Sequence, residues 1–227
     1  MNMETALLLH GAIGAAAQLQ PIADILSETY EVHMPDFPGH GGTPLPAEPF
    51  SVSFFAHYIV TYIEQHKLPA VTVFGYSMGG YVALYLARHY PQLINRVITL
   101  GTKFYWDEAT AAKETAMLVP EVIEAKVPAF AASLKILHTP ENWKEVLLRT
   151  AAMLQEMGKN NPLQPEALSQ IVTPALLMVG DRDKMVSVDE TIGVYHVLPD
   201  AQLAVLPATV HAIERVKPLL VKAFVNC

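Results

Sequence analysis

The sequence predicts an α/β protein in which a mainly parallel sheet carries helices on both faces and an inserted helical cap. Short apolar runs rich in β-branched residues alternate with segments whose apolar residues recur at helical spacing. Helical segments of this length usually connect parallel strands. Strand character is absent between residues 102 and 165 and then resumes. We therefore expect the helical block to interrupt one α/β unit.

The elements follow one another in a regular order. The run from Thr5 to Leu9 is apolar throughout, as in a strand that is buried on both faces of a sheet. Turn-forming residues at 35–44 predict an ordered loop. The predicted strands are 5–9, 30–34, 71–74, 96–100, 174–179 and 201–206. The predicted helices of the alternating parts are 18–27, 50–66, 81–88, 188–196 and 213–225.

The interrupting block is expected to form three helices, at 107–118, 122–137 and 141–157. The third is expected to start at a cap within Thr139-Pro140-Glu141. Open parallel sheets bind ligands at the carboxyl ends of their strands, so we expect the block to cover that end as a cap.

The composition is that of one folded domain. Of 227 residues, 52% are hydrophobic and 16% are charged, which excludes a disordered chain. The length predicts a single domain over residues 1–227, with the cap inserted at about 102–165. The net charge of −7, with no cluster of Lys or Arg, argues against nucleic-acid binding.

The N-terminus and the cysteine content indicate a cytoplasmic protein. Glu4 stands where a secretory signal would carry basic residues, and no apolar stretch approaches the roughly 20 residues that cross a bilayer. Cys227 is the only cysteine, so no intramolecular disulfide and no thiolate metal site can form. We expect a soluble protein without membrane contact, either a monomer or a homodimer.

The motif Gly75-Tyr76-Ser77-Met78-Gly79-Gly80 joins the apolar run 71–74 to a helical segment. A serine flanked by glycines between a strand and a helix is typical of a nucleophile elbow, a sharp turn that exposes the hydroxyl group. The glycines are needed because the backbone and the neighbouring strands approach closely there. Unpaired amides at the start of the helix would favour a developing oxyanion.

A serine nucleophile requires a base, and the base requires an acid that holds its tautomer. The ends of later strands supply both groups. Asp181 and Asp183 follow the strand at 174–179, and His211 follows the last strand. The two aspartates are two residues apart on one loop, so periodicity does not choose between them.

Together these motifs resemble the α/β-hydrolase superfamily over essentially the whole chain. The matching motifs, in family order, are His10-Gly11, Asp36-x-Pro38-Gly39-His40-Gly41, the elbow, Gly180-Asp181-Arg182-Asp183 and His211-x-x-Glu214. The resemblance implies Ser77 as nucleophile, His211 as general base and acid, and Asp183 as the orienting acid. It also implies an oxyanion hole made by the backbone amides of Ala12 and Met78.

The chain departs from the family pattern at two places. Val210 replaces the usual glycine before the histidine, so the turn there is expected to differ. The common N-terminal hairpin is missing, which implies a shortened sheet of about six parallel strands. Asp181 is then expected to stabilise its turn, and Asp36 to bond within its own turn.

The remaining histidines are expected to be structural. His10 and His40 lie in family motifs as loop-stabilising groups, and the others show no spacing to a second metal ligand. We expect no metal and no cofactor.

The sequence as a whole predicts a serine hydrolase that cleaves a small, largely apolar carboxylic ester or thioester through an acyl-enzyme. The cap would set specificity, and Tyr76, Tyr105 and Trp106 are the predicted substrate-binding residues. A small molecule is the expected partner.

Three other readings stay open. The elbow and the Asp-x-Pro-Gly-His-Gly loop also resemble the menaquinone-pathway synthase that eliminates pyruvate with the same triad. That family commonly has an arginine after the Gly-Gly pair, where this chain has Tyr81. A carbon–carbon bond hydrolase would use the same residues on another substrate. A small-molecule receptor with slow or absent turnover is possible on the same fold.

Overall fold

The computed structural model describes residues 3–225, so Cys227 lies outside the described residues. Six strands form one sheet in the order β2-β1-β3-β4-β5-β6, and every neighbouring pair is parallel. The predicted α/β class and six-stranded parallel sheet are confirmed. The strands are β1 (Glu4–Leu9), β2 (Tyr30–His33), β3 (Val71–Tyr76), β4 (Ile94–Leu100), β5 (Ala175–Gly180) and β6 (Ala201–Leu206).

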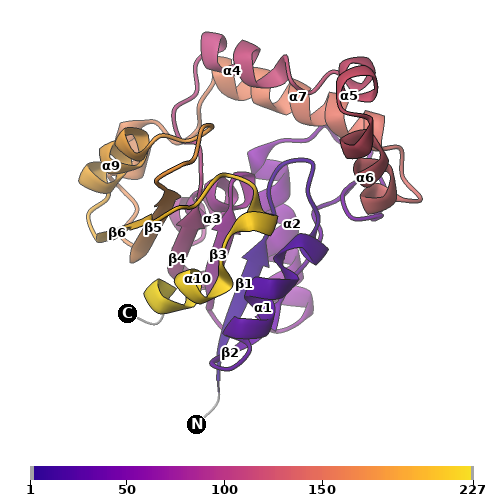
Figure 1. Cartoon of the computed structure of the whole chain (residues 1–227). Coiled ribbons are helices and arrows are strands. Elements are labelled where there is room, and N and C mark those ends of the chain that lie inside the picture. The colour runs from indigo at the N-terminus through magenta and orange to yellow at the C-terminus, as the bar shows by residue number, and fades with distance from the viewer. Residues whose placement is uncertain (1–2, 226–227) are drawn as a thin grey trace.

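Helices cover both faces of the sheet (Figure 1). Alternate residues of each strand point to opposite faces, so Leu7 and Leu9 belong to one apolar core and Ala6 and Leu8 to the other. The first core is closed by α2 (Val52–Gln65), α3 (Met78–His89) and α9 (Val188–Val197). The second is closed by α1 (Gln20–Leu26) and α10 (Pro218–Val225).

Between β4 and β5 the chain forms a helical insertion, residues 108–168. Figure 1 shows its long helices beyond the carboxyl ends of the central strands. Trp143 and Leu147 pack there against Ile123 and Leu134 in a small core of their own. The insertion comprises α4 (Glu108–Thr115), α5 (Pro120–Lys126), α6 (Pro128–His138), α7 (Trp143–Lys159) and α8 (Pro165–Leu168).

Proline breaks two of the expected helices. The helix predicted at 122–137 is wrong, because α5 ends at Lys126 and α6 begins at Pro128. Val127 between them has φ −139° and ψ 61°, as expected for a residue that proline keeps out of the helical region. The closing helix predicted at 213–225 is likewise divided into a short 3-10 helix, η3 (Ile213–Arg215), and α10, which begins at Pro218.

Two helix starts also differ from expectation. The third cap helix starts at Trp143, after an N-cap at Asn142 whose side chain accepts from the Lys144 amide, and not within Thr139-Pro140-Glu141. The helix expected at 18–27 is preceded by a 3-10 turn, η1 (Ala16–Leu19), before α1 begins. A second such turn, η2 (Pro91–Leu93), leads into β4.

Within residues 3–225, no helix is both long and apolar enough to cross a membrane.

Candidate active site

Ser77 lies in the sharp turn between β3 and α3, at the carboxyl end of a central strand. Its φ of 51° and ψ of −116° are uncommon for a residue with a side chain. Hydrogen bonds hold this conformation: the Ser77 amide donates to the Leu100 carbonyl at 2.9 Å, and the Thr102 hydroxyl donates to the Ser77 carbonyl at 3.0 Å. Such strain is maintained only where the surroundings over-determine the backbone, and it is common at functional sites.

The elbow glycines are required by close packing. A Cβ atom on Gly79 would overlap the carbonyl oxygen of Leu9 at the end of β1, and one on Gly75 would overlap the Gly80 amide nitrogen. A Cβ atom on Gly11 would lie 2.8 Å from the Tyr76 ring and 3.3 Å from the Ser77 Cβ. The end of β1 and the elbow are therefore in direct contact.

Two helical glycines give a stability prediction. Gly79→Ala should lower the free energy of unfolding by about 1–3 kcal/mol, since backbone atoms must move to admit the methyl group. Gly193→Ala in α9 has open space around its Cβ and should raise it by about 0.5–1 kcal/mol, the ordinary gain for alanine in a helix. Urea unfolding of the two variants measures both changes, and an equal response at the two positions would contradict the packing argument.

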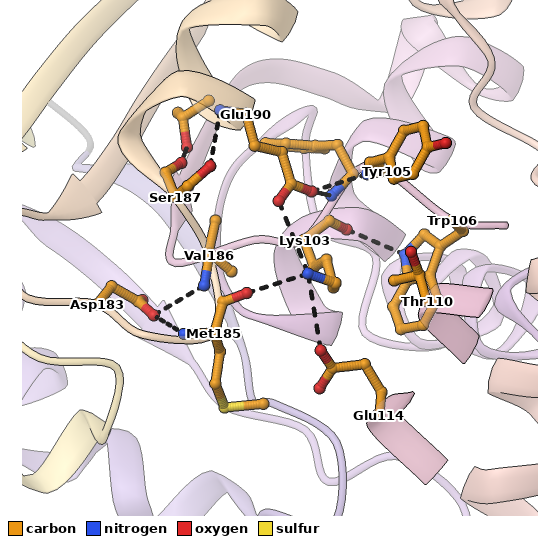
Figure 2. Close-up of polar contacts among 12 residues, drawn as sticks. Lys103, Tyr105, Trp106, Thr110, Glu114, Asp183, Met185, Val186, Ser187 and Glu190 are labelled. Carbon is orange, nitrogen blue, oxygen red and sulfur yellow. Dashed lines mark hydrogen bonds and ion pairs between the residues drawn. The ribbon is translucent and has the colours of Figure 1, made fainter. Parts of the chain in front are cut away.

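The side chains of Asp183 and His211 form a direct pair. His211 Nδ1 lies 2.7 Å from Asp183 Oδ2, and the Asp183 side chain is only 2% exposed. Asp183 Oδ1 accepts from the amides of Met185 at 2.8 Å and Val186 at 2.9 Å (Figure 2). Burial opposes ionisation of Asp183, but the bonds from His211 and these amides outweigh it and lower its pKa.

Asp181 turns away from this pair. It is exposed, and its Oδ1 accepts from the Thr209 amide at 3.1 Å. Hydrogen bonds from the backbone of Ala208 and then Thr209 lower its pKa. Ala208 takes a φ of 52° in this turn, two residues before Val210. The carboxylate therefore stabilises the turn that leads to the histidine, as the sequence suggested.

Two further groups support His211, and neither role was predicted from the sequence. Gly101, with φ 59°, directly follows β4, and a Cβ atom on it would lie 3.2 Å from Asp183 Oδ2 and 3.3 Å from His211 Nδ1. The Tyr76 hydroxyl donates to the His211 carbonyl at 2.9 Å. Burial raises the pKa of Tyr76, so its hydroxyl stays a donor. The only local sequence feature that could have indicated the role of Gly101 is the position of a glycine directly after a predicted strand.

The predicted oxyanion-hole loop, residues 10–16, follows β1. Ile13 has φ 52°, an uncommon conformation for a β-branched residue. The Ala12 amide makes no backbone hydrogen bond within residues 3–225. Met78 is the first residue of α3, where an amide has no acceptor within the helix. Both amides are thus available on the two backbone segments that meet at Ser77.

Side chains from distant segments hold this loop. Asp36 Oδ1 accepts from the Ala16 amide at 2.7 Å, so its bond goes to another loop and the expectation that it bonds within its own turn is wrong. His138 on α6 accepts from the Gly41 amide at 3.2 Å through Nδ1, which leaves Nε2 to donate to the Ile13 carbonyl at 3.0 Å. No local pattern around His138 predicts this role.

Three buried histidines lie in contact beneath the loop. The ring centroids of His10 and His40 are 5.2 Å apart, and those of His40 and His138 are 5.8 Å apart. The Phe37 amide donates to His10 Nε2 at 3.1 Å, so His10 Nδ1 donates to the Gly11 carbonyl at 2.8 Å. Burial lowers the pKa of His10 from 6.5 to about 4 and also lowers the pKa values of His40 and His138. These imidazoles are therefore neutral at pH 7.

Protonation of these histidines should destabilise the fold. In the unfolded chain they bind protons below about pH 6.5, whereas the folded chain resists until lower pH, so stability falls as pH decreases from about 6.5 to 4. At pH 5 each such group can cost up to about 2 kcal/mol. We expect the free energy of unfolding at pH 5 to lie at least about 2 kcal/mol below that at pH 7.5.

Urea unfolding at the two pH values measures this difference. Asp183 does not contribute in this range, because a carboxylate with a lowered pKa is ionised at pH 5 in both states. His138→Gln can keep an acceptor and a donor, and it should reduce the pH dependence. His57→Gln, at an exposed position, should leave it unchanged. Equal stability of the unaltered protein at pH 5 and pH 7.5 would show that the buried histidines do not resist protonation.

A cavity of about 620 Å³ adjoins the elbow and the histidine. Ala12, Ser77, Met78 and His211 line it together with apolar residues of the helical insertion, among them Met117, Phe130, Leu134, Leu154 and Met157. Of the predicted substrate-binding residues, Tyr76 and Trp106 line the cavity.

Tyr105 does not line this cavity, so the structure gives no support to its predicted contact with substrate. Its side chain is 61% exposed and its hydroxyl donates to Asp107 at 3.0 Å. The backbone amide of Tyr105 donates to Glu190 Oε1 at 2.8 Å (Figure 2). Within the described residues, no group of three or more His, Cys, Asp or Glu side chains could hold a metal ion.

Residues 6–160, more than half of the chain, match the model of a protein family described as the alpha/beta hydrolase fold. The chain belongs to the α/β-hydrolase family. This confirms the resemblance that the motifs indicated. The match spans β1, the elbow and most of the helical insertion.

Relatives of this α/β-hydrolase include enzymes with different substrates. Pimeloyl-(acyl-carrier protein) methyl ester esterase of Neisseria meningitidis is 27% identical over 227 aligned residues, covering 90% of this chain and 85% of that protein. 3-Oxoadipate enol-lactonase 2 of Acinetobacter baylyi is 30% identical over 118 residues, 51% of this chain and 44% of that protein. The chain thus matches less than half of the lactonase's length.

Among solved structures, a thermophilic esterase from Thermogutta terrifontis aligns with a TM-score of 0.79 at 19% identity. The alignment covers 99% of this chain and 89% of that one. At this identity the likeness shows the fold, and the substrate has to be argued from the site itself.

Proposed function

We propose that the protein is a serine hydrolase that cleaves a small, largely apolar carboxylic ester or thioester through an acyl-enzyme on Ser77. The observation that carries the proposal is the 2.7 Å pair of His211 and Asp183 at the cavity that Ser77 also lines. A serine in an elbow, a histidine and a buried carboxylate are the parts of a nucleophilic triad.

In the proposed reaction, Ser77 Oγ attacks the carbonyl carbon while His211 Nε2 takes its proton. Asp183 stabilises the imidazolium through Nδ1, and the amides of Ala12 and Met78 donate to the oxyanion. His211 then gives the proton to the leaving alcohol or thiol. Water, deprotonated by the same imidazole, attacks the acyl-enzyme and releases the carboxylic acid and free Ser77.

The lining supports an apolar substrate of modest size. Its methionines, leucines and Phe130 come mostly from the helical insertion, which we propose acts as a cap. A cavity of this volume is within the usual range for sites that take small ligands. Tyr81, which stands where the pyruvate-eliminating synthases commonly have an arginine, does not favour that alternative. Its hydroxyl is hydrogen-bonded to Asn161 and to the Leu163 amide.

Hydrolysis of p-nitrophenyl esters of increasing acyl length tests the proposal. A burst of p-nitrophenol, followed by steady turnover with an acyl adduct on the Ser77 peptide, is the expected result. The chain length with the highest kcat/KM then gives the size of the acyl site. Binding of an ester without turnover would favour a receptor, and no reaction with any ester would direct attention to carbon–carbon bond cleavage.

A further inference from the structure

A charged cluster lies in the wall of the mainly apolar cavity. Lys103 and Glu114 both line the cavity, and they come from the loop after β4 and from α4. Lys103 Nζ lies 3.7 Å from Glu114 Oε1 and 3.7 Å from Glu190 Oε2 (Figure 2). It also donates to the Met185 carbonyl at 3.0 Å. Met185 links this cluster to the Asp183–His211 pair, because its amide donates to Asp183 Oδ1.

Protein groups hold Glu190 and Lys103 in place. Glu190 Oε1 accepts from the amides of Phe104 at 2.7 Å and Tyr105 at 2.8 Å. Lys103 Nζ donates to the Met185 carbonyl, and the carboxylates of Glu114 and Glu190, each 3.7 Å away, compensate its charge. The positive charge of Lys103 is therefore already opposed by two carboxylates of the protein.

Glu114 differs from Glu190, because its side chain makes no hydrogen bond among those found for residues 3–225. Its distance of 3.7 Å to Lys103 exceeds the hydrogen-bond range. The side chain is only 8% exposed, although a carboxylate can accept about four hydrogen bonds. Its oxygens are not among the buried side-chain atoms without a partner, so they remain accessible from the cavity. The donors that it lacks can come from a molecule in the cavity that it lines.

The net charge of the cluster indicates whether the substrate group that binds there is a hydrogen-bond donor or an acceptor. One positive charge on Lys103 stands against two negative charges on Glu114 and Glu190, and a further carboxylate, Glu214, lines the same cavity. A carboxylate on the substrate would be repelled, whereas an ammonium group would neutralise the excess charge. A hydroxyl group would supply the missing bond without the charge.

We propose that Glu114 binds a hydrogen-bond donor, an ammonium or hydroxyl group, on the part of the substrate remote from the reacting carbonyl. This inference rests on the proposed function, and it narrows the substrate from an apolar ester to one with a polar terminus. The rest of the lining holds the methylene chain between the two ends. Glu114 is then a specificity-determining residue, and Lys103 holds its carboxylate in place.

The test compares p-nitrophenyl esters of four acyl chains of equal length: hexanoate, 6-hydroxyhexanoate, 6-aminohexanoate and the half-ester of adipate. We expect kcat/KM for the amino or hydroxy ester to exceed that for hexanoate by about tenfold, the value of one good polar contact. The adipate half-ester should be the poorest substrate. Glu114→Gln should abolish the preference for the amino ester, and Glu114→Asp should keep part of it.

The ratio of kcat/KM between two esters does not depend on the folded fraction of the enzyme. A partly unfolded variant therefore still shows which ester is preferred. Glu121→Gln removes the same charge from an exposed position on α5 and should leave every ratio unchanged. A preference for hexanoate or adipate, or a preference for the amino ester that survives in Glu114→Gln, would overturn the proposal. If no ester reacts, the proposed function fails, and calorimetry of hexylamine and of hexanoate with the unaltered protein and with Glu114→Gln tests the role of Glu114 by itself. Equal binding of the two, or tighter binding of hexanoate, would then refute the inference.

Discussion

Ser77→Ala should lower kcat for the preferred p-nitrophenyl ester by about 10⁵- to 10⁶-fold, the cost of removing the nucleophile from a complete triad. His211 and Asp183 cannot replace it, because the acyl group needs an oxygen to which it can be transferred. The burst of p-nitrophenol and the acyl adduct should disappear together. Steady-state kinetics and intact-protein mass spectrometry measure both.

A second serine in the same cavity provides the control for this variant. Ser133 also lines the cavity, but its hydroxyl donates to the Phe130 carbonyl at 2.8 Å. Ser133→Ala removes the same atom from the same cavity and should change kcat/KM by no more than about threefold. If Ser77→Ala kept more than about 1% of the activity, or if both variants lost activity equally, Ser77 would not be the nucleophile.

Features that depend on local sequence could be predicted for this protein. The apolar runs predict the central strands, because a strand that is buried on both faces needs a continuous apolar segment. The edge strands β2 and β6 are only partly buried and have a weaker apolar pattern. The glycines around Ser77 predict the elbow, since the close approach of backbone from β1 and α3 leaves no room for side chains. The two prolines that divide predicted helices, Pro128 and Pro218, are visible in the sequence. The apolar residues keep their helical spacing across both prolines, however, and the helices were therefore predicted as continuous.

Contacts between distant segments could not be predicted. His138 reaches the Ile13 carbonyl across 125 positions of sequence, and nothing near it indicates that partner. Lys103 and Glu114 meet because α4 packs beside the loop after β4, which the residue pattern does not specify. An aromatic residue in the predicted cap suggested a pocket contact for Tyr105, yet its side chain is exposed and its hydroxyl donates to Asp107.

The second large effect is expected at the acid. Asp183→Asn should lower kcat by about 10⁴-fold, as in a serine protease where the same change leaves the geometry intact but disturbs the histidine tautomer. An asparagine amide can donate to His211 Nδ1, and the imidazole proton then moves to Nε2, the atom that must accept the proton of Ser77. The variant should still bind substrate, so KM should change far less than kcat.

Asp181→Asn is the matched control, because it removes the same charge from the same loop. Its exposed side chain bonds the Thr209 amide, and an asparagine carbonyl can accept that bond, so kcat should stay within about twofold of the unaltered protein. Steady-state kinetics of the two variants at pH 7.5 separates the candidates. A larger loss from Asp181→Asn would make Asp181 the orienting acid despite the 2.7 Å contact of Asp183 with His211. Equal and small losses would mean that His211 needs no acid, because the Tyr76 hydroxyl bound to its carbonyl and the packing of Gly101 would then suffice to hold the ring.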